Sequence, residues 1–174
     1  MRLFIAVDLS NETLNELERL QNELIDANLD CSRSKSFHLT LKFLGEVNKK
    51  SVATIVKELE KIKFKEFGLT LGNLGVFEHE GMIKVLWAGI EKSDALDDLY
   101  NAIKCVLHEF KNDKDFSPHL TLARIKSVDN KQVFMDKLEK TKANKITSQV
   151  NSFVLYKSTL THSGAVYEKI KEFY

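Results

Sequence analysis

The stretch FHLTLKFLGEV at residues 37–47 contains the tetrapeptide HLTL, and the stretch PHLTLARI at residues 118–125 contains it again. The two histidines lie 81 residues apart (119 − 38), a little under half of the 174-residue chain. Both stretches alternate apolar and polar residues as a β-strand does. A repeat at this spacing indicates that the chain consists of two related halves.

The elements around the two copies also recur in one order. Ser10 and Ser93 are good helix N-caps, each follows an apolar strand-like run, and they lie 83 residues apart (93 − 10). Each half is predicted as strand, helix, motif strand, helix, strand. The predicted strands are 3–9, 37–44, 67–77, 82–90, 119–125 and 148–157, and a last extended segment covers about 166–173. Helices are predicted after Ser10, from about Val52, after Ser93, and over the stretch with Val133, Phe134 and Leu138. We interpret this as an internal duplication that gives a pseudo-two-fold α+β protein.

Side chains two residues apart lie on one face of a strand. His38 therefore shares a face with Thr40, and His119 shares a face with Thr121, while the alternating leucines point to the other side, where helices can cover them. With a pseudo-two-fold axis, the two histidine–threonine faces can line one cleft.

Composition narrows the choice of function. The formal net charge is only +1, which argues against the basic surface of a non-specific duplex binder. A local cation cluster could still hold a nucleotide or a nucleic-acid end. Cys31 and Cys105 fit no metal spacing and are expected to be reduced thiols. Neither a signal peptide nor a membrane helix is indicated, so we expect a soluble cytoplasmic protein.

Two histidines suit proton transfer around a phosphate diester. An unperturbed pKa near 6.5 lets one imidazole be neutral while the other is protonated. The neutral one can accept a proton from water or a hydroxyl, and the protonated one can donate to the leaving oxygen. Threonine hydroxyls can donate to the phosphate oxygens. Two histidines without a nearby carboxylate cluster form a poor metal site, so no metal or other cofactor is expected.

HLTLKFLGEV and PHLTLARI resemble the paired HxTx motifs of the 2H phosphoesterase superfamily. The opening MRLFIAVDL, the stretch KVLWAGI at 84–90 and the ending FVLYKSTLTHSGAVY at 153–167 are most similar to its RNA 2′,3′-cyclic phosphodiesterase branch, the LigT-like 2′-5′ RNA ligases. The resemblance implies one domain over residues 1–174 with two lobes, each an antiparallel sheet with outer helices, and an active-site cleft between the lobes.

The resemblance also implies metal-independent hydrolysis of a 2′,3′-cyclic phosphate to a 2′-phosphomonoester. By motif position, His38 is then the proton donor to the leaving O3′ and His119 the proton acceptor that activates water, while Thr40 and Thr121 hold the phosphate. Two features depart from the branch. The tryptophan and Pro-Glu-Asn stretch before the first motif is replaced by CSRSKSF at 31–37, and Ser117 stands where many members have a basic residue.

Arg124 and Lys42 are further candidates for substrate binding. Arg124 matches a family arginine, with a surface salt bridge as the alternative, and Lys42 would share the face of His38 if the strand stayed regular, with an ordinary solvated lysine as the alternative. Three aromatic residues could stack a base but are more simply core: Phe37, Phe116 and Tyr156. Three histidines lack any partner pattern: His79, His108 and His162.

The sequence thus predicts a monomeric RNA 2′,3′-cyclic phosphodiesterase, whose partner is an RNA end or a nucleotide with a cyclic phosphate. Two alternatives stay open. One keeps the site and changes the reaction to 2′-5′ phosphodiester cleavage or RNA ligation, and the other is an RNA-end binding module without turnover.

Overall fold

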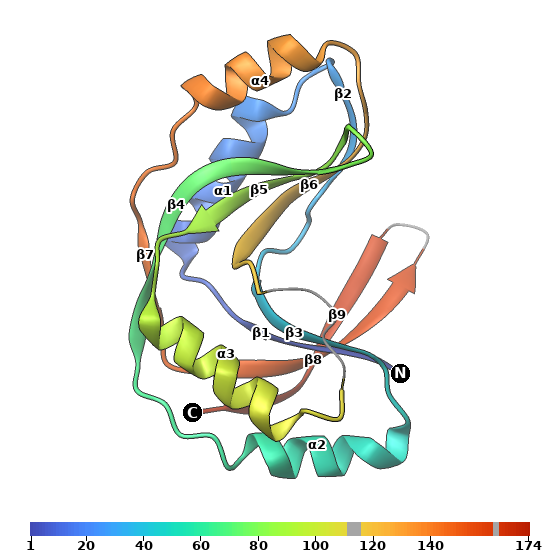
Figure 1. The fold of residues 1–174 in the computed structure, drawn as a ribbon, viewed down its shortest axis with the longest axis vertical. Helices are drawn as coiled ribbons and strands as arrows, with labels where there is room; N and C mark the ends of the chain where they lie inside the picture. Colours follow the sequence, from blue (N-terminus) through green and yellow to red (C-terminus); the bar gives the residue numbers. More distant parts are fainter. Residues whose placement is uncertain (111–115, 162–163) are drawn as a thin grey trace.

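The computed structural model describes residues 1–110, 116–161 and 164–174, in which two antiparallel sheets are flanked by four α-helices (Figure 1). The first sheet has the strand order β3-β1-β8-β9, and the second sheet has the order β2-β6-β5-β4-β7. The strands are β1 (Arg2–Val7), β2 (Leu29–Arg33), β3 (Leu39–Glu46), β4 (Phe67–His79), β5 (Met82–Ile90), β6 (His119–Val128), β7 (Thr147–Val150), β8 (Phe153–Thr161) and β9 (Gly164–Phe173). The helices are α1 (Asn11–Leu24), α2 (Val52–Leu59), α3 (Asp94–Val106) and α4 (Lys131–Lys140), with a short 3-10 turn at Lys49–Ser51. The predicted bilobal α+β fold is confirmed.

The two sheets do not correspond to the two halves of the sequence. In the first sheet, β1 and β3 of the first half pair with each other, but β8 of the second half pairs with β1. In the second sheet, β5 and β6 of the second half pair, and β4 of the first half pairs with β5. The last strand of each half therefore completes the other half's sheet, an exchange that strand order along the chain cannot reveal.

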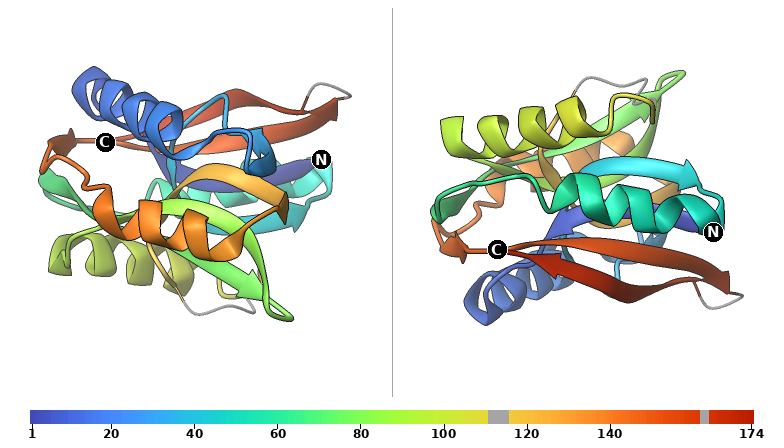
Figure 2. Two further views of the ribbon diagram at one scale, coloured as in Figure 1. Left: turned by 90° about the horizontal axis from the view of Figure 1, so that it is seen from above. Right: turned by 90° about the horizontal axis from the view of Figure 1, so that it is seen from below.

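The helices are exchanged in the same way. Helix α1, which follows β1, packs against β6, whereas α3, which follows β5, packs against β3. Both helices begin as predicted, because the Ser10 hydroxyl accepts a hydrogen bond from the Thr13 amide and the Ser93 hydroxyl accepts one from the Leu96 amide, each at 3.3 Å. Figure 2 shows the helices on the outer sides of the two sheets.

We call the side of each sheet turned away from its helices the inner face. On the motif strands, the leucines of both HLTL copies are at most 2 % exposed and belong to the main hydrophobic core, at positions Leu39, Leu41, Leu120 and Leu122. The histidines and threonines between them are only partly buried. The predicted alternation is therefore confirmed, and it brings both histidine–threonine pairs to the inner faces.

Each motif strand loses its regular register directly after its threonine. On β3, Thr40 lies opposite Ala6 and Lys42 opposite Ile5, so Leu41 is an extra residue. On β6, Leu122 is the extra residue in the same position of the motif. A bulge of this kind turns the following side chain to the other face. Because the strand is not regular, Lys42 does not share the face of His38. It lies beside Ile5 on the helix-covered side, with 2 % of its surface exposed.

Two parts of the chain differ from the predicted elements. Strand β2 lies in a stretch for which no strand is predicted, and the single strand predicted over 148–157 is divided into β7 and β8, which belong to different sheets.

Both cysteines are free thiols. Along the described ranges of the chain, no helix combines the length and the apolar character that crossing a membrane requires.

Candidate active site

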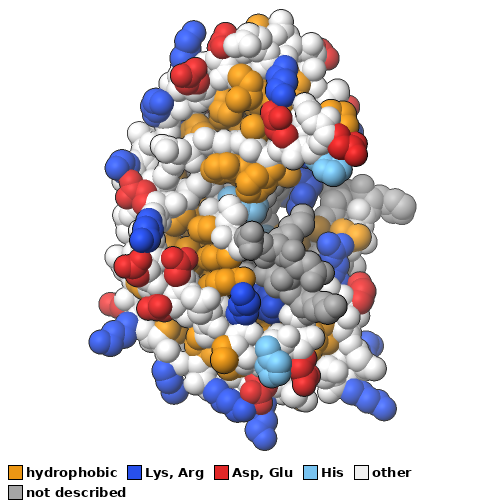
Figure 3. Space-filling view, viewed as in Figure 1, with side chains coloured by type: hydrophobic (Ala, Val, Ile, Leu, Met, Phe, Trp, Pro, Cys, Tyr) orange, Lys and Arg blue, Asp and Glu red, His pale blue; other side chains and the backbone are white. Residues whose placement is uncertain are grey.

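The two motif strands adjoin where the two sheets meet, since residues of β3 and β6 have Cα atoms within 8 Å of one another. The surface is hollowed between the sheets, and pale-blue histidine atoms are visible within the hollow (Figure 3). His38 lies one residue before β3, and His119 is the first residue of β6. The structure thus brings the two predicted pairs, His38 with Thr40 and His119 with Thr121, to adjoining inner faces.

His38 is enclosed by aromatic rings of the first sheet. The centroid of its ring lies 4.9 Å from that of Phe4, 6.2 Å from that of Tyr156, and 5.0 Å from that of Tyr167, which it meets edge-on at 88°. Burial among these rings lowers the pKa of His38 to about 4, and the nearby Asp8 carboxylate opposes that shift only in part. In the free protein His38 is therefore neutral near pH 7.

His119 is held by the backbone. Its Nδ1 lies 2.7 Å from the carbonyl oxygen of Ser117, and because a carbonyl can only accept, Nδ1 carries a hydrogen. In the neutral imidazole, Nε2 then has the free lone pair. The ring also meets Phe77 edge-on, with centroids 4.8 Å apart. This arrangement presents Nε2 as a proton acceptor.

The threonine hydroxyls are available to a ligand. Within the described residues, neither Thr40 nor Thr121 donates or accepts a side-chain hydrogen bond, and neither hydroxyl oxygen is an unsatisfied buried atom. Two accessible hydroxyls beside two imidazoles can hold the oxygens of a tetrahedral anion.

Asp8 connects β8 and β9 to the aromatic rings around His38. The Tyr156 hydroxyl donates to Oδ1 of Asp8 at 2.5 Å, and Nζ of Lys169 lies 2.6 Å from Oδ2. Burial raises the pKa of the Tyr156 phenol, so it remains a donor at neutral pH. These two contacts fix the Asp8 carboxylate near His38 and offset its charge. The two HxT motifs do not predict a role for Asp8. The alternation of side chains along β1 does place Asp8, the residue directly after that strand, on the same face as Phe4.

Trp87 forms part of the inner face of the second sheet, opposite Thr121 in the register of β5 and β6. Its indole lies over Gly75 of β4, where an added Cβ would come within 2.3 Å of Cζ2. Only glycine leaves room for the ring there. Its Nε1 is buried and has no hydrogen-bond partner among the described residues. The chain thus lacks the family tryptophan before the first motif but places its single tryptophan beside the second motif.

Arg124 lies on the inner face of the second sheet, because it pairs with Val85 while Thr121 pairs with Trp87, two residues further along β5. Its side chain is exposed, and it has neither an ion pair nor a hydrogen bond within the described residues. The structure therefore leaves the Arg124 guanidinium free on the side of His119. Lys42, by contrast, has burial and the nearby Lys104 charge lowering its pKa on the other face of β3.

Of the remaining sequence candidates, only Tyr156 lies beside a motif histidine, as part of the aromatic cluster around His38. Tyr156 is 8 % exposed, Phe37 packs against the main core, and Phe116 stacks on Tyr100 with centroids 4.0 Å apart. His79 is exposed beside Glu80, His108 contacts the Cys105 carbonyl, and His162 lies outside the described residues. Sequence reasoning missed Phe4, Phe77 and Tyr167, which contact the two histidines in addition to Tyr156.

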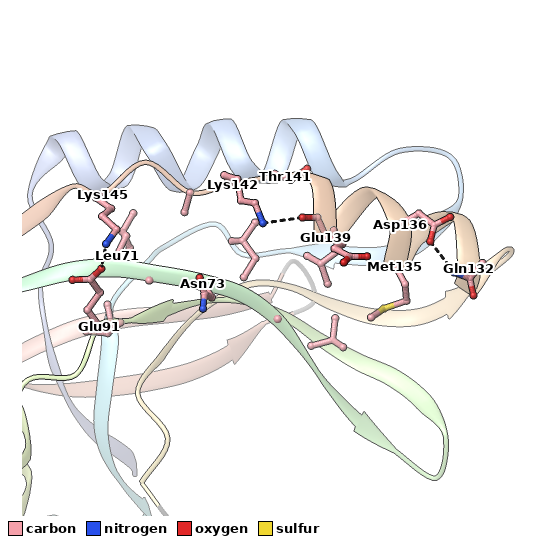
Figure 4. A pocket seen from close by; sticks show the side chains of 17 residues that line it. Leu71, Asn73, Glu91, Gln132, Met135, Asp136, Glu139, Thr141, Lys142 and Lys145 are labelled. Carbon is pink, nitrogen blue, oxygen red and sulfur yellow. Dashed lines mark hydrogen bonds and ion pairs between the residues drawn. The ribbon is translucent and has the colours of Figure 1, made fainter.

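A groove of about 1030 Å³ lies between the outer edge of β4 and α4, away from the motif strands (Figure 4). Several of its polar side chains already have partners, as in the ion pair of Lys145 with Glu91 at 2.7 Å and the hydrogen bond from Gln132 to Asp136 at 2.7 Å. No residue of the two motifs lines this groove, so we do not assign it the role of active site despite its volume. Over the described parts of the chain, no three histidine, cysteine or acidic side chains gather closely enough to hold a metal ion.

Two histidine–threonine pairs on adjoining inner faces of a bilobal α+β fold are the arrangement expected of a 2H phosphoesterase. A family model described as LigT like phosphoesterase matches residues 7–87 and 89–167, and the chain belongs to that family. The two matched stretches begin 82 residues apart (89 − 7), close to the spacing of the motif histidines.

Several curated relatives match over nearly their whole length. The chain is 33% identical to an RNA 2′,3′-cyclic phosphodiesterase of Methanocaldococcus jannaschii, with 99% of both chains covered. It is 31% identical to a protein of the same name from Thermotoga maritima, with 99% of this chain and 94% of the relative covered.

Solved structures show the same fold. The protein TT0787 of Thermus thermophilus superposes with a TM-score of 0.81 at 25% identity, covering 99% of this chain and 97% of that chain. E. coli LigT complexed with 3′-AMP gives a TM-score of 0.77 at 23% identity, with coverages of 98% and 95%.

Proposed function

We propose that this protein hydrolyses 2′,3′-cyclic phosphates at the ends of RNA or on nucleotides, giving 2′-phosphomonoesters. The observation that carries the proposal is the pair of partly exposed imidazoles, each beside a free threonine hydroxyl, on adjoining inner faces. The names of the full-length relatives, RNA 2′,3′-cyclic phosphodiesterase, support the choice of substrate.

His119 is the proton acceptor in this proposal. Its Nδ1–H is held by the Ser117 carbonyl, which leaves Nε2 to take a proton from the attacking water. The water oxygen then bonds to phosphorus as the bond from phosphorus to O3′ breaks. The product keeps the phosphate on O2′ and gains a hydroxyl at C3′.

His38 is the proton donor to O3′ and must therefore be protonated in the substrate complex. With a pKa of about 4 in the free protein, His38 is not protonated near pH 7 until the substrate raises that pKa. A bound cyclic phosphate brings a negative charge beside the ring, and an opposite charge within a few ångströms raises the pKa of an imidazole. Substrate binding thus supplies the condition that lets His38 donate.

Thr40 and Thr121 bind the non-bridging phosphate oxygens, and Arg124 offsets the phosphate charge from the side of His119. Their hydroxyls and guanidinium have no competing partner within the described residues, which favours these roles. No step needs a metal or other cofactor, because the two histidines supply both proton transfers.

The test is incubation with a nucleoside 2′,3′-cyclic phosphate and with a cyclic-phosphate-ended oligonucleotide, each with and without EDTA. The proposal expects hydrolysis to the 2′-phosphate at equal rates in both conditions. Unchanged substrate after prolonged incubation, or activity abolished by EDTA, would contradict it.

The donor assignment has its own test. A cyclic substrate with sulfur in place of O3′ has a leaving thiolate that needs no proton. His38→Ala should therefore lose much less activity on this substrate than on the oxygen substrate, while His119→Ala should lose about as much on both. The opposite pattern would exchange the two roles.

A further inference from the structure

The inner face of the first sheet continues outward from His38 along the β8–β9 hairpin. Arg2 on β1 pairs with Ser158 on β8, which pairs with Tyr167 on β9, so these three side chains form a row across the sheet. Leu160 lies two residues beyond Ser158, on the same face, about 7 Å further along the strand. We call these four residues, Arg2, Ser158, Leu160 and Tyr167, the hairpin strip.

The strip begins at the catalytic site and leads away from it. Tyr167 contacts both His38 and Phe4, with ring centroids 5.0 and 5.1 Å apart. The hairpin extends past the start of β1 (Figure 2), which leaves Leu160 without a neighbouring strand on that side. Leu160 is 69% exposed and Tyr167 is 36% exposed. The outward end of the strip is thus an apolar surface that continues directly from the site.

The charge on this face favours an anion. Among the described residues, Arg2 has no ion pair and no side-chain hydrogen bond. Three acids on the same face are already engaged. Glu46 binds the N-terminal amine at 2.8 Å, Asp8 binds Lys169 and Tyr156, and Glu172 accepts a hydrogen bond from the Ser152 hydroxyl. A free guanidinium in the same row as an aromatic ring, and diagonally across from an exposed leucine, is suited to a chain of alternating phosphates and bases.

We propose that the hairpin strip binds the nucleotides that precede the cyclic phosphate, so that the protein acts on single-stranded RNA ends in preference to free cyclic mononucleotides. This inference rests on the proposed function. Tyr167 stacks on the terminal base beside His38, Arg2 binds the preceding phosphate, and Leu160 contacts the next base. A single strand is required, because the bases of a duplex are not free to stack on side chains.

The test compares kcat/KM for a nucleoside 2′,3′-cyclic phosphate and for a cyclic-phosphate-ended oligonucleotide. Arg2→Gln and Leu160→Ser should each lower the oligonucleotide value by roughly 5- to 20-fold and change the mononucleotide value by less than about twofold. Tyr167→Leu should lower both values, because Tyr167 also contacts His38. Arg2→Gln should further weaken the salt dependence of the oligonucleotide KM.

Val166→Ser is the matched control. Val166 is 55% exposed on the same hairpin but pairs with Thr159 on the opposite face, so this variant should leave both substrates unaffected. Equal kcat/KM for both substrates, unchanged by the strip variants, would overturn the inference. So would a loss confined to Phe43→Ser, an exposed aromatic at the β3 edge, because RNA would then leave the site over that edge.

An error in the RNA-binding role of the hairpin strip can be distinguished from an error in the proposed function. If the wild type hydrolyses neither substrate, the proposed function is wrong, and fluorescence anisotropy with a labelled single-stranded oligonucleotide 2′-phosphate still tests the strip. Weaker binding by Arg2→Gln and Leu160→Ser, but not by Val166→Ser, would support it. Equal binding by all variants would contradict the inference, and the hairpin strip would then be a candidate surface for binding another protein.

Discussion

Thr40 and Lys42 lie two residues apart on β3 but on opposite faces of the first sheet. The register shift at Leu41 causes this, because Thr40 pairs with Ala6 of the inner face and Lys42 pairs with Ile5 of the main core. Lys42 is consequently a buried amine whose ordinary charge is disfavoured by burial and by Lys104.

Lys42→Met should therefore stabilise the fold while sparing activity. Methionine has a similar length and carries no charge to bury, so we expect a gain on the order of 1 kcal/mol in the free energy of unfolding. Turnover should stay within about threefold of wild type. Thermal unfolding and cyclic-phosphate hydrolysis measure the two effects, with Lys57→Met, at an exposed position of α2, as control. A folded Lys42→Met protein without activity would mean that Lys42 reaches the substrate.

The buried imidazole of His38 should make stability depend on pH. Its folded pKa of about 4 lies below the ordinary value of 6.5, so between these values the unfolded chain binds more protons. Stability should thus fall as the pH decreases from about 6.5 to about 4, by at most about 3 kcal/mol from this residue. Denaturant unfolding of wild type and His38→Phe across this range isolates the effect. Parallel pH curves for the two proteins would contradict the burial of a neutral imidazole.

Binding of a phosphate should reverse that pKa shift. A nucleoside 2′-phosphate, the expected product, places negative charge beside His38, so the ring should take up a proton on binding near pH 6. Calorimetric titration in buffers of different ionisation enthalpy measures this proton uptake. The phosphate's own protonation is common to all variants, so His38→Gln serves as the control and should take up fewer protons. Equal uptake by both proteins would place the titrating group elsewhere.

Gly75→Ala should damage the wall beside Thr121. The added methyl group would come within 2.3 Å of the Trp87 indole, which must then move from its place opposite Thr121. We expect kcat to fall by about 10-fold or more, since small displacements in a site are costly. Gly68→Ala is a control on the same strand, because its closest contact, at 2.8 Å, is the methyl end of the Thr147 side chain. Trp87 fluorescence reports whether the ring has moved.

The sequence predicted the features that depend on local pattern. The alternation in each HLTL copy correctly assigned histidine and threonine to one face, and Ser10 and Ser93 were correctly identified as helix caps. These predictions hold because strand geometry and capping depend on neighbours along the chain.

The features that the sequence did not predict depend on contacts between distant segments. The exchange of β4 and β8 between sheets, the bulge that buries Lys42, and the approach of Tyr167 to His38 each involve residues far apart in the chain. The alternation of apolar residues continues through Leu41, so nothing in the pattern marks the extra residue. Tyr167 lies in a strand exposed on most of its length, where no apolar period identifies an inner face.

The central claim is that His38 and His119 act together on one phosphate. Its most direct test is kcat for a cyclic-phosphate-ended oligonucleotide with His38→Ala, His119→Ala and the double variant. Each single variant should lose about 10²- to 10⁴-fold with its fold intact by circular dichroism. The double variant should lose less than the product of the two single losses, because the two residues act on one proton-transfer path. Wild-type turnover in either single variant would contradict the account.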